Sequence, residues 1–370
     1  MRARTSALAA TTVAAGSSGY VVAAVLTEVA ADHGVTTAAA GHTLTAFALA
    51  YAVGSPLLAM LTARVERRTL LVVALLVTAL GNIGSAVAPT LDLLLVARVL
   101  TACGAALATP AATAVAAQLD PDHKARAMAV VTAGLTAATL LGVPAGRLVA
   151  DQHGYRAAFV LVAVLCVVAA LVVRAAVPRV PPGPVVGFRQ RLAPLADPPV
   201  RRLLAVSLLA CLATFAVYGY LGAITGRPPD GGHLLAYGVG GVLGNAIGGL
   251  AADRHGPRTP LLVALGGCAA VLAVLATAPV GPTAFVVMAA WGGLFWAFNP
   301  PLFAALVAVD PDRANLLLAL NASAIYTGIA CAGVLGGAID APAVPLVGAA
   351  VAVAATAIAA TTRGRRLVAS

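Results

Sequence analysis

The sequence predicts an all-α membrane protein with twelve transmembrane helices, arranged as two pseudo-symmetric six-helix bundles. Three observations lead to this fold class. The chain is 61% hydrophobic and only 10% charged, whereas about a quarter of a soluble domain is charged. Twelve apolar runs of about 20 residues, each long enough to cross a bilayer, alternate with polar breaks along the 370 residues. Most arginines and lysines lie in every second break.

The apolar runs define the expected spans. The first run continues to about Ala30, which is too long for a signal peptide, so we expect it to form the first spanning helix. Charged residues and turn formers, such as Asp32-His33-Gly34, separate the runs. We expect spans at 7–30, 41–63, 69–89, 93–118, 127–149, 157–178, 203–225, 233–252, 259–278, 283–308, 314–338 and 342–361.

The placement of basic residues predicts the orientation. If both termini lie in the cytoplasm, every Lys and Arg falls in a cytoplasmic segment except Arg98, Arg147, Arg156 and Arg227. The net charge of +10 therefore reports membrane topology, and we expect a lipid bilayer and no nucleic acid as partner.

A proline- and arginine-rich segment divides the chain into two related halves. We expect a six-helix bundle over 1–178, a cytoplasmic linker over 179–202 and a second bundle over 203–370. The motif AYAVG from Ala50 returns as AYGVG from Ala236, which indicates duplication. Duplicated halves are typical of secondary transporters, whose substrate site lies between the halves near mid-membrane.

Arg98 is the residue that most strongly indicates function. It lies about 10 Å inside the fourth run at 1.5 Å per residue, where a guanidinium needs a carboxylate, a carbonyl or water. The alternative is an arginine whose side chain reaches the headgroups. The fifth run places Gly134, Gly142 and Gly146 on one helix face, which permits close packing. Pro144 is expected to bend this helix.

The ordered motifs resemble the major facilitator superfamily, in its drug:proton antiporter branch, and are similar to bacterial chloramphenicol and arabinose exporters. RVLTACGAA from Arg98, GLTAATLLGVPAG from Gly134 and GYRAAF from Gly154 carry the resemblance. GGLAADRHGPR from Gly248 resembles the cytoplasmic loop signature, and LTARVERR from Leu61 is its degenerate first-half counterpart. The resemblance implies a bacterial cytoplasmic (inner) membrane location.

The loop signature implies a conformational gate. Asp253, with Arg254 and Arg258, would latch the two halves together, and Glu66 with Arg67 would occupy the matching place in the first half. The alternative is a solvated loop whose charges only set topology.

One departure from the resemblance concerns proton coupling. Relatives carry an acidic residue in helix 1, and this chain has Gly19 there. A proton-coupled exporter needs a group that loads and releases protons, and arginine cannot serve alone. We expect Glu28 to carry the proton, paired with Arg98 or Arg147. The alternative is an interfacial glutamate that ends helix 1.

The substrate site is expected among aromatic and polar residues of helices 1, 4, 7, 10 and 11, because such residues suit an amphiphile. The alternative for each is a headgroup-level or packing residue. The candidates are Tyr20, Phe215, Tyr218, Tyr220, Trp291, Trp296, Asn299 and Tyr326.

The expected function is export of a small amphiphilic molecule (a drug, an antibiotic or a sugar-like compound) by alternating access, in exchange for protons. We expect a monomer with no cofactor beyond the proton gradient. An uncoupled or uptake facilitator is the alternative. An intramembrane enzyme is remote, because the histidines lie at span ends or in loops and the five cysteines have no metal spacing.

Overall fold

The computed structural model describes residues 2–120, 124–182, 187–226, 230–277 and 281–362. In this part of the chain every regular element is a helix. Twelve helical segments are long and apolar enough to cross a membrane, as the sequence predicted. The fold is therefore all-α and multi-pass.

The first half of the chain forms the helices α1 to α8. Their bounds are α1 (Arg2–Tyr20), η1 (Val21–Ala24), α2 (Leu26–Asp32), α3 (Thr37–Leu61), α4 (Arg67–Val87), α5 (Leu91–Leu119), α6 (Lys124–Ala137), the π-helical turn η2 (Ala138–Gly142), α7 (Val143–His153) and α8 (Tyr155–Ala176).

The second half follows a connecting segment that contains α9 (Phe188–Leu192) and η3 (Ala193–Ala196). Its elements are α10 (Pro198–Gly219), α11 (Leu221–Thr225), α12 (Gly231–His255), α13 (Arg258–Leu275), α14 (Pro282–Ala297), α15 (Asn299–Val309), η4 (Pro311–Arg313), α16 (Ala314–Ala338), η5 (Ala341–Ala343) and α17 (Val344–Thr361).

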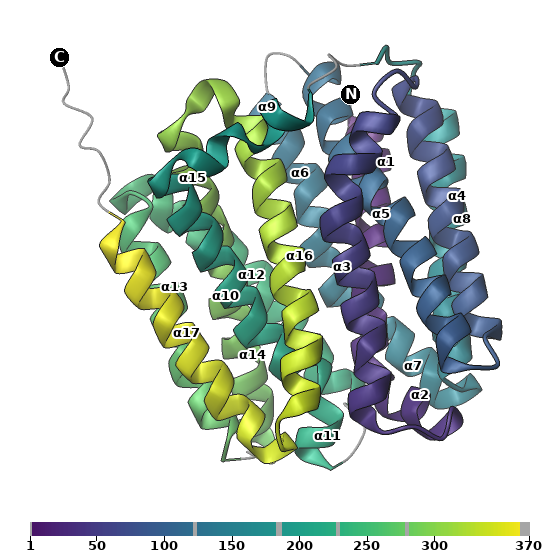
Figure 1. Cartoon of the computed structure of the whole chain (residues 1–370), viewed down its shortest axis with the longest axis vertical. Helices are drawn as coiled ribbons and strands as arrows, with labels where there is room; N and C mark the ends of the chain where they lie inside the picture. The colour runs from purple at the N-terminus through teal and green to yellow at the C-terminus, as the bar shows by residue number, and fades with distance from the viewer. Residues whose placement is uncertain (1, 121–123, 183–186, 227–229, 278–280, 363–370) are drawn as a thin grey trace.

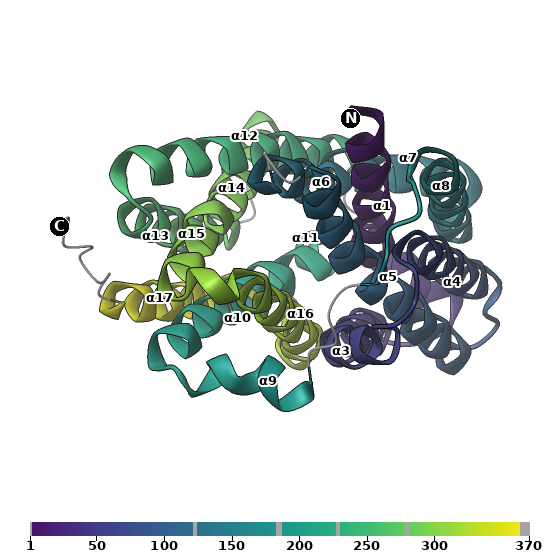
Figure 2. The same cartoon turned by 90° about the horizontal axis from the view of Figure 1, so that it is seen from above.

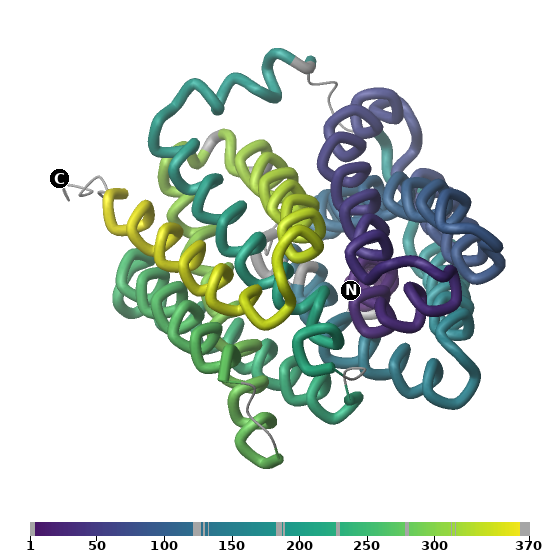
Figure 3. Tube along the Cα trace, turned by 60° about the horizontal axis from the view of Figure 1, so that its bottom comes forward, coloured from purple at the N-terminus to yellow at the C-terminus, as the bar shows by residue number. Residues whose placement is uncertain are grey.

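The two sets of helices stand side by side (Figure 1). We call the end that carries α9 and the N-terminus the linker end, and the end that carries α2 and α11 the α2 end. Seen from the linker end, α1, α3, α6, α10, α14 and α16 surround the centre (Figure 2). The trace of α9 and η3 runs along the linker end on its way to α10 (Figure 3).

Side-chain oxygens begin several of the helices. Thr36, Thr90 and Asp230 each accept a hydrogen bond from a backbone N–H in the first turn of α3, α5 and α12. Such caps satisfy amide groups that have no partner within the helix. These polar residues also lie at the breaks between apolar runs, so the same positions end one span and begin the next.

Three spans are interrupted. Helix 1 ends at Tyr20 and continues as η1, and the separate α2 begins only after Val25. The tenth span breaks between Ala297 and Asn299. The fifth span widens into η2 just before Pro144. Since proline has no N–H, it leaves a carbonyl of the preceding turn unpaired, and a π turn is one way to absorb that defect.

The observed ends of α1 and α10 correct two expected boundaries. The first span was expected to reach residue 30, but Glu28 lies in the first turn of the separate α2. The seventh span begins at Pro198, earlier than expected, and ends at Gly219, with α11 as a separate helix. Hydrophobicity extends through both breaks, so the apolar pattern did not reveal them.

Small residues pack the helices in corresponding ways in both halves. A Cβ at Gly134 would lie 2.1 Å from Thr12 Oγ1, and one at Gly142 would lie 1.9 Å from Ser17 Oγ, so the fifth span rests on α1. A Cβ at Gly328 would lie 2.3 Å from the Leu208 carbonyl, so the eleventh span rests on α10 in the same manner. Close approach of this kind requires glycine.

Candidate functional site

A small central cavity of about 10 Å³ lies between the two halves. Helices α1, α3, α10 and α16 and the turn η1 supply its walls. The lining residues are Gly19, Tyr20, Ala23, Leu44, Phe47, Phe215, Tyr326 and Ile329. The cavity therefore draws on both halves of the chain, and its wall is aromatic and aliphatic.

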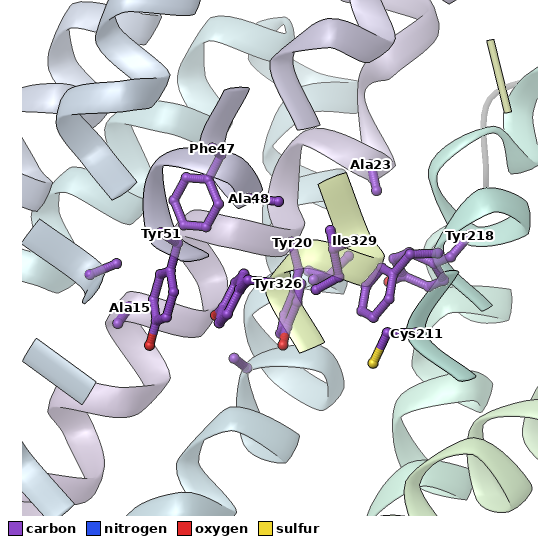
Figure 4. Packing of buried hydrophobic residues seen from close by; sticks show 14 of the residues in the cluster. Ala15, Tyr20, Ala23, Phe47, Ala48, Tyr51, Cys211, Tyr218, Tyr326 and Ile329 are labelled. Atoms are coloured by element: carbon purple, nitrogen blue, oxygen red, sulfur yellow. The ribbon is translucent and has the colours of Figure 1, made fainter. Parts of the chain in front are cut away.

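Aromatic rings join the halves across this cavity. Tyr20 stacks on Phe215 with a ring-centroid distance of 5.5 Å. Tyr51 stacks on Tyr326 at 3.5 Å. Figure 4 shows the rings of Tyr51, Tyr326 and Tyr20 side by side, each from a different helix. These contacts hold the centre of the molecule closed around very little space.

The aromatic cluster continues into the second half. Phe215 meets the edge of Tyr218 at 6.0 Å, and Tyr218 in turn lies 6.0 Å from Trp291. Trp296 packs edge-on against Phe295 at 5.5 Å. Tyr218 Oη, Trp291 Nε1 and Trp296 Nε1 are buried and have no hydrogen-bond partner among the described residues. The cluster thus holds several donors that a ligand acceptor could use.

Arg98 is fully buried on α5. Its Nη2 donates to the Ser18 carbonyl at 2.8 Å, whereas its Nε and Nη1 have no partner in the described part of the chain. The guanidinium lies 4.6 Å from the ring centroid of Phe47 and 5.8 Å from that of Phe159. The side chain therefore stays inside the bundle and does not reach toward headgroups.

Phe47 connects Arg98 to the cavity. It lines the cavity, and its ring covers the guanidinium. A Cβ at Gly19 would lie 3.1 Å from the same ring. One aromatic ring from α3 thus contacts the buried cation and also lines the space between the halves.

Glu28 pairs with Arg147 and not with Arg98. The Arg147 guanidinium donates to Glu28, to Asp151 and, at 3.0 Å, to the Ala24 carbonyl. The Arg147 side chain is 8% exposed and that of Glu28 is 28% exposed. Glu28 is therefore a partly accessible carboxylate that ties α2 to α7 at the α2 end.

A second ion pair holds the same short helix. Arg156 donates to Asp32 at 2.9 Å and to the Ala86 carbonyl at 3.1 Å. Tyr155 Oη also donates to Asp32, at 2.8 Å. The bonds from Arg156 and Tyr155 lower the pKa of Asp32 below its ordinary value. Helix α2 is thus bound by charge to α7 and α8.

Close contacts bring the halves together toward the α2 end. Thr45 Oγ1 donates to the Ala330 carbonyl at 3.1 Å, across the halves. A Cβ at Gly41 would lie 1.7 Å from Tyr220 Oη, which donates to the Gly333 carbonyl. Tyr220 is thus a contact between halves at the α2 end and does not line the cavity with Tyr20.

The fifth and eighth spans also meet between the halves. A Cβ at Gly238 would lie 2.4 Å from the Leu140 Cα, within the π-helical turn η2. The backbone of α12 therefore lies directly against the interrupted part of the fifth span. No side chain could fit between these two elements in this state.

The residues of the loop signature lie at the linker end. Asp253 and Arg254 are exposed, and Asp253 makes no ion pair with a described residue. Arg258 donates to the Ala360 carbonyl at 2.9 Å, near the end of α17. In this state Arg258 therefore binds within its own half.

Glu66 has a defined local role. Its carboxylate caps α4 and accepts hydrogen bonds from the backbone N–H groups of Arg68, Thr69 and Val180. Burial opposes ionisation, but the bonds from Thr69 and these amides outweigh it and lower the pKa of Glu66 to about 2. Arg67 adds a backbone bond to the Val180 carbonyl at 3.0 Å. Both residues thus fasten the connecting segment to α4.

The structure gathers some expected site residues and separates others. Tyr20, Phe215 and Tyr326 line the cavity. Tyr218, Trp291, Trp296 and Asn299 are buried beyond it. The fourth and tenth spans were expected in the wall of the cavity. Phe47 of α3, the second span, instead covers Arg98 of the fourth span, and Phe215 lies between the cavity and the aromatic residues of the tenth span.

The sequence did not reveal that the second span, α3, contributes residues to the site. Leu44, Phe47 and Tyr51 lie in an ordinary apolar run, and nothing in their spacing distinguishes lining from packing. A second set of glycines at four-residue spacing was also not predicted. Gly240, Gly244 and Gly248 of α12 pack against backbone carbonyls of α14. Their four-residue spacing was a usable signal.

No metal-like cluster of His, Cys, Asp or Glu occurs among the described residues.

Twelve apolar helices around a cavity between related halves define a multi-pass membrane transporter. The family model of the Major Facilitator Superfamily matches residues 7–333. The chain therefore belongs to the Major Facilitator Superfamily, and it is a transporter and not an enzyme.

Known relatives are similar over most of the chain. The "Inner membrane transport protein YdhP" of Escherichia coli O157:H7 is 32% identical over 310 residues, covering 81% of this chain and 79% of that protein. The "Chloramphenicol resistance protein" of Streptomyces lividans is 33% identical over 276 residues, covering 70% and 68%. A bacterial homolog of the human lysosomal transporter Spinster, solved in an inward-facing and unoccupied conformation, matches with a TM-score of 0.75 and 17% identity over 97% and 98% of the two chains, which shows a shared fold.

Proposed function

We propose that this transporter exports a small amphiphilic molecule across the bacterial cytoplasmic membrane, in exchange for protons, by alternating access. The observation that carries the proposal is the central cavity, because residues of both halves form it. A site shared by two halves is exposed to one side or the other when the halves rock. We take residues 1–178 and 203–370 as the moving units, joined by the linker 179–202.

The basic-residue pattern supports cytoplasmic termini, and with that orientation the linker end would lie inside the cell. The inter-half contacts around Gly41, Thr45 and Gly238 would then close the outer side. We infer that rocking breaks these contacts and forms others at the linker end. Asp253, exposed here, is available to latch the linker end in the opposite state.

The wall of the cavity supports an amphiphilic substrate. Aromatic faces from Tyr20, Phe215 and Tyr326 suit a flat or ring-bearing molecule, and the nearby unpartnered donors suit its polar groups. Two of the relatives are named an inner membrane transport protein and a chloramphenicol resistance protein, which makes chloramphenicol a first probe.

Glu28 is the proposed proton carrier. It is partly exposed and ion-paired with Arg147, which keeps a second acidic partner in Asp151. Protonation of Glu28 would cancel one of the two ion pairs that hold α2, without leaving Arg147 unpaired. The charge state of one carboxylate would thereby change how α2 is held at the α2 end.

Uncoupled movement of a solute is a second candidate function. It is favoured by the position of the acidic residues, since none of the thirteen Asp and Glu lies deep within a span. This candidate shares the cavity and the rocking motion but needs no proton carrier.

Transport into everted membrane vesicles separates the two functions. We expect chloramphenicol or another amphiphile of a test panel to accumulate in vesicles that contain the protein, and only while a proton gradient is maintained. Accumulation in everted vesicles corresponds to export from cells. Equilibration at the same rate with and without the gradient would contradict proton exchange and favour the uncoupled facilitator.

A further inference from the structure

Arg98 carries a positive charge that forms no ion pair with a described residue. The side chain is completely buried, and its Nε and Nη1 have no hydrogen-bond partner in the described part of the chain. A buried charge without a partner is strongly unfavourable, and an arginine cannot relieve the cost by losing its proton. The Ser18 carbonyl and the Phe47 ring interact with the guanidinium, but neither carries a negative charge.

The acidic residues lie away from the middle of the spans. All thirteen Asp and Glu lie outside the spans or within three residues of a span end. Glu28, the acid closest in sequence to Ser18, is bound to Arg147. The state shown here therefore leaves one full positive charge near mid-bundle that no described residue neutralises.

The geometry places this charge beside the substrate cavity. Phe47 lines the cavity, and its ring also covers the guanidinium. Gly19 lines the cavity next to Ser18, whose carbonyl Arg98 binds. A rotation of the Phe47 side chain would therefore open Arg98 to a ligand held among Tyr20, Phe215 and Tyr326.

We propose that Arg98 binds the anionic group of the transported molecule, and that the preferred ligand is a small aromatic oxyanion such as a carboxylate. The unpartnered Nε and Nη1 leave N–H donors free on two edges of the planar guanidinium, and an oxygen of a carboxylate can accept a charge-assisted hydrogen bond at either edge. The aromatic body would lie among Tyr20, Phe215 and Tyr326 once movement of the halves widens the small cavity that these residues line. This inference rests on the proposed exporter function and names the ligand class of that site.

Binding of three probes of equal ring structure and different charge tests the ligand class. The probes are p-nitrobenzoate, p-nitrobenzyl alcohol and p-nitrobenzyltrimethylammonium, measured by equilibrium dialysis against the full chain in lipid nanodiscs. We expect p-nitrobenzoate to bind at least about tenfold more tightly than the cation, since a buried like charge opposes cation binding. Equal or tighter binding of the cation would overturn the inference.

A matched pair of variants isolates the charge. Gly19→Asp places a carboxylate beside the carbonyl that Arg98 binds, and Gly19→Asn has the same size without the charge. The two substituted side chains make the same close contact with Phe47, since any Cβ at position 19 lies 3.1 Å from the Phe47 ring. We expect p-nitrobenzoate to bind at least about tenfold more weakly to Gly19→Asp than to Gly19→Asn. Equal affinities would overturn the inference.

Two further measurements complete the test. The first distinguishes an organic from an inorganic anion at the site, and the second distinguishes anion binding from export. Binding of p-nitrobenzoate that is unchanged between chloride and gluconate buffers assigns the site to the organic carboxylate. Weaker binding in chloride shows that an inorganic anion occupies the same site, which also supports an anion site at Arg98. Charge-selective binding without any transport in vesicles would refute export while leaving the anion site intact.

Discussion

At the scale of single residues, Arg98 dominates the electrostatics of the bundle. Burying a guanidinium in a low-dielectric interior costs several kcal/mol even after relaxation, and one carbonyl with two aromatic faces recovers only part of it. A residue with this cost persists only where function needs it. Its position behind Phe47 gives that function a direct route to the cavity.

Replacement of Arg98 tests this reasoning. We expect Arg98→Ala to abolish transport while the protein still inserts, because the change removes an unfavourable buried charge. Arg98→Lys should retain little transport, since an ammonium cannot reproduce the guanidinium fork. Transport is measured in vesicles at matched expression. Full activity of Arg98→Ala would assign the residue to packing alone.

Glu28 is the residue on which proton coupling is expected to depend. We expect Glu28→Gln to lose gradient-driven accumulation while substrate-for-substrate exchange continues, because glutamine keeps the size but cannot load a proton. Both activities are measured on the same vesicles. Asp92→Asn, which changes an acid at the start of α5, serves as the matched control and should keep accumulation. If Glu28→Gln still accumulates substrate, Glu28 is not the carrier.

The individual site residues differed in how far the sequence revealed them. Arg98 was predictable, because a charge inside an apolar run is conspicuous. Arg147 was correctly named as one of two partners for Glu28. Phe47 and Tyr51 were not predictable, because an aromatic residue in an apolar run has the same pattern whether it packs a helix or lines a cavity. Only the arrangement of helices in space distinguishes the two.

At the scale of helices, the interrupted fifth span is the element most suited to movement. Its π turn lies against Ser17 of α1 on one side and Gly238 of α12 on the other. Proline at position 144 weakens the hydrogen bonding there, so the two parts of the span can bend relative to each other. The expected weak point at Pro144 coincides with a π-helical turn, whose form and contact with α12 depend on tertiary packing.

Enlarging a glycine in this element should block the exchange. We expect Gly142→Leu to abolish transport, because even a Cβ there would lie 1.9 Å from Ser17 Oγ. Gly266→Leu is the control, since nothing lies within 4 Å of a Cβ at that position, and it should transport normally. Normal transport by Gly142→Leu at normal expression would show that the fifth span does not need its close contact with α1.

The cap of α4 predicts a pH-dependent stability. The pKa of Glu66 falls from about 4.5 to about 2 on folding, so the unfolded state binds the proton more readily and ionised Glu66 stabilises the folded state. That stabilisation is complete above about pH 4.5 and is lost as the pH falls toward 2. Loss of such a cap costs about 1 kcal/mol.

Thermal unfolding in detergent measures this effect. We expect Glu66→Gln to unfold at a lower temperature than the wild type at neutral pH, with a difference that shrinks as the pH falls below about 4.5. A difference that is constant with pH would mean that the ionised carboxylate is not the stabilising species. This cap was missed from the sequence, because Glu66 was assigned to the gate.

At the scale of the whole molecule, the two halves use the same packing plan. The fifth span rests on α1, and the eleventh rests on α10, each through small residues at four-residue spacing. Span number and this repeated pattern were predictable, since hydrophobicity and spacing encode both. Which faces meet between halves was not, because that depends on the conformational state.

The central claim is that the two ends open and close in alternation. Paired spin labels test it most directly, one pair at the α2 end on Gln152 and Asp340 and one at the linker end on Arg64 and His255, in a variant without the five native cysteines. All four positions are exposed. Distances are measured with and without p-nitrobenzoate. We predict that the α2-end distance lengthens whenever the linker-end distance shortens. Distances that stay fixed, or that lengthen together at both ends, would contradict alternating access.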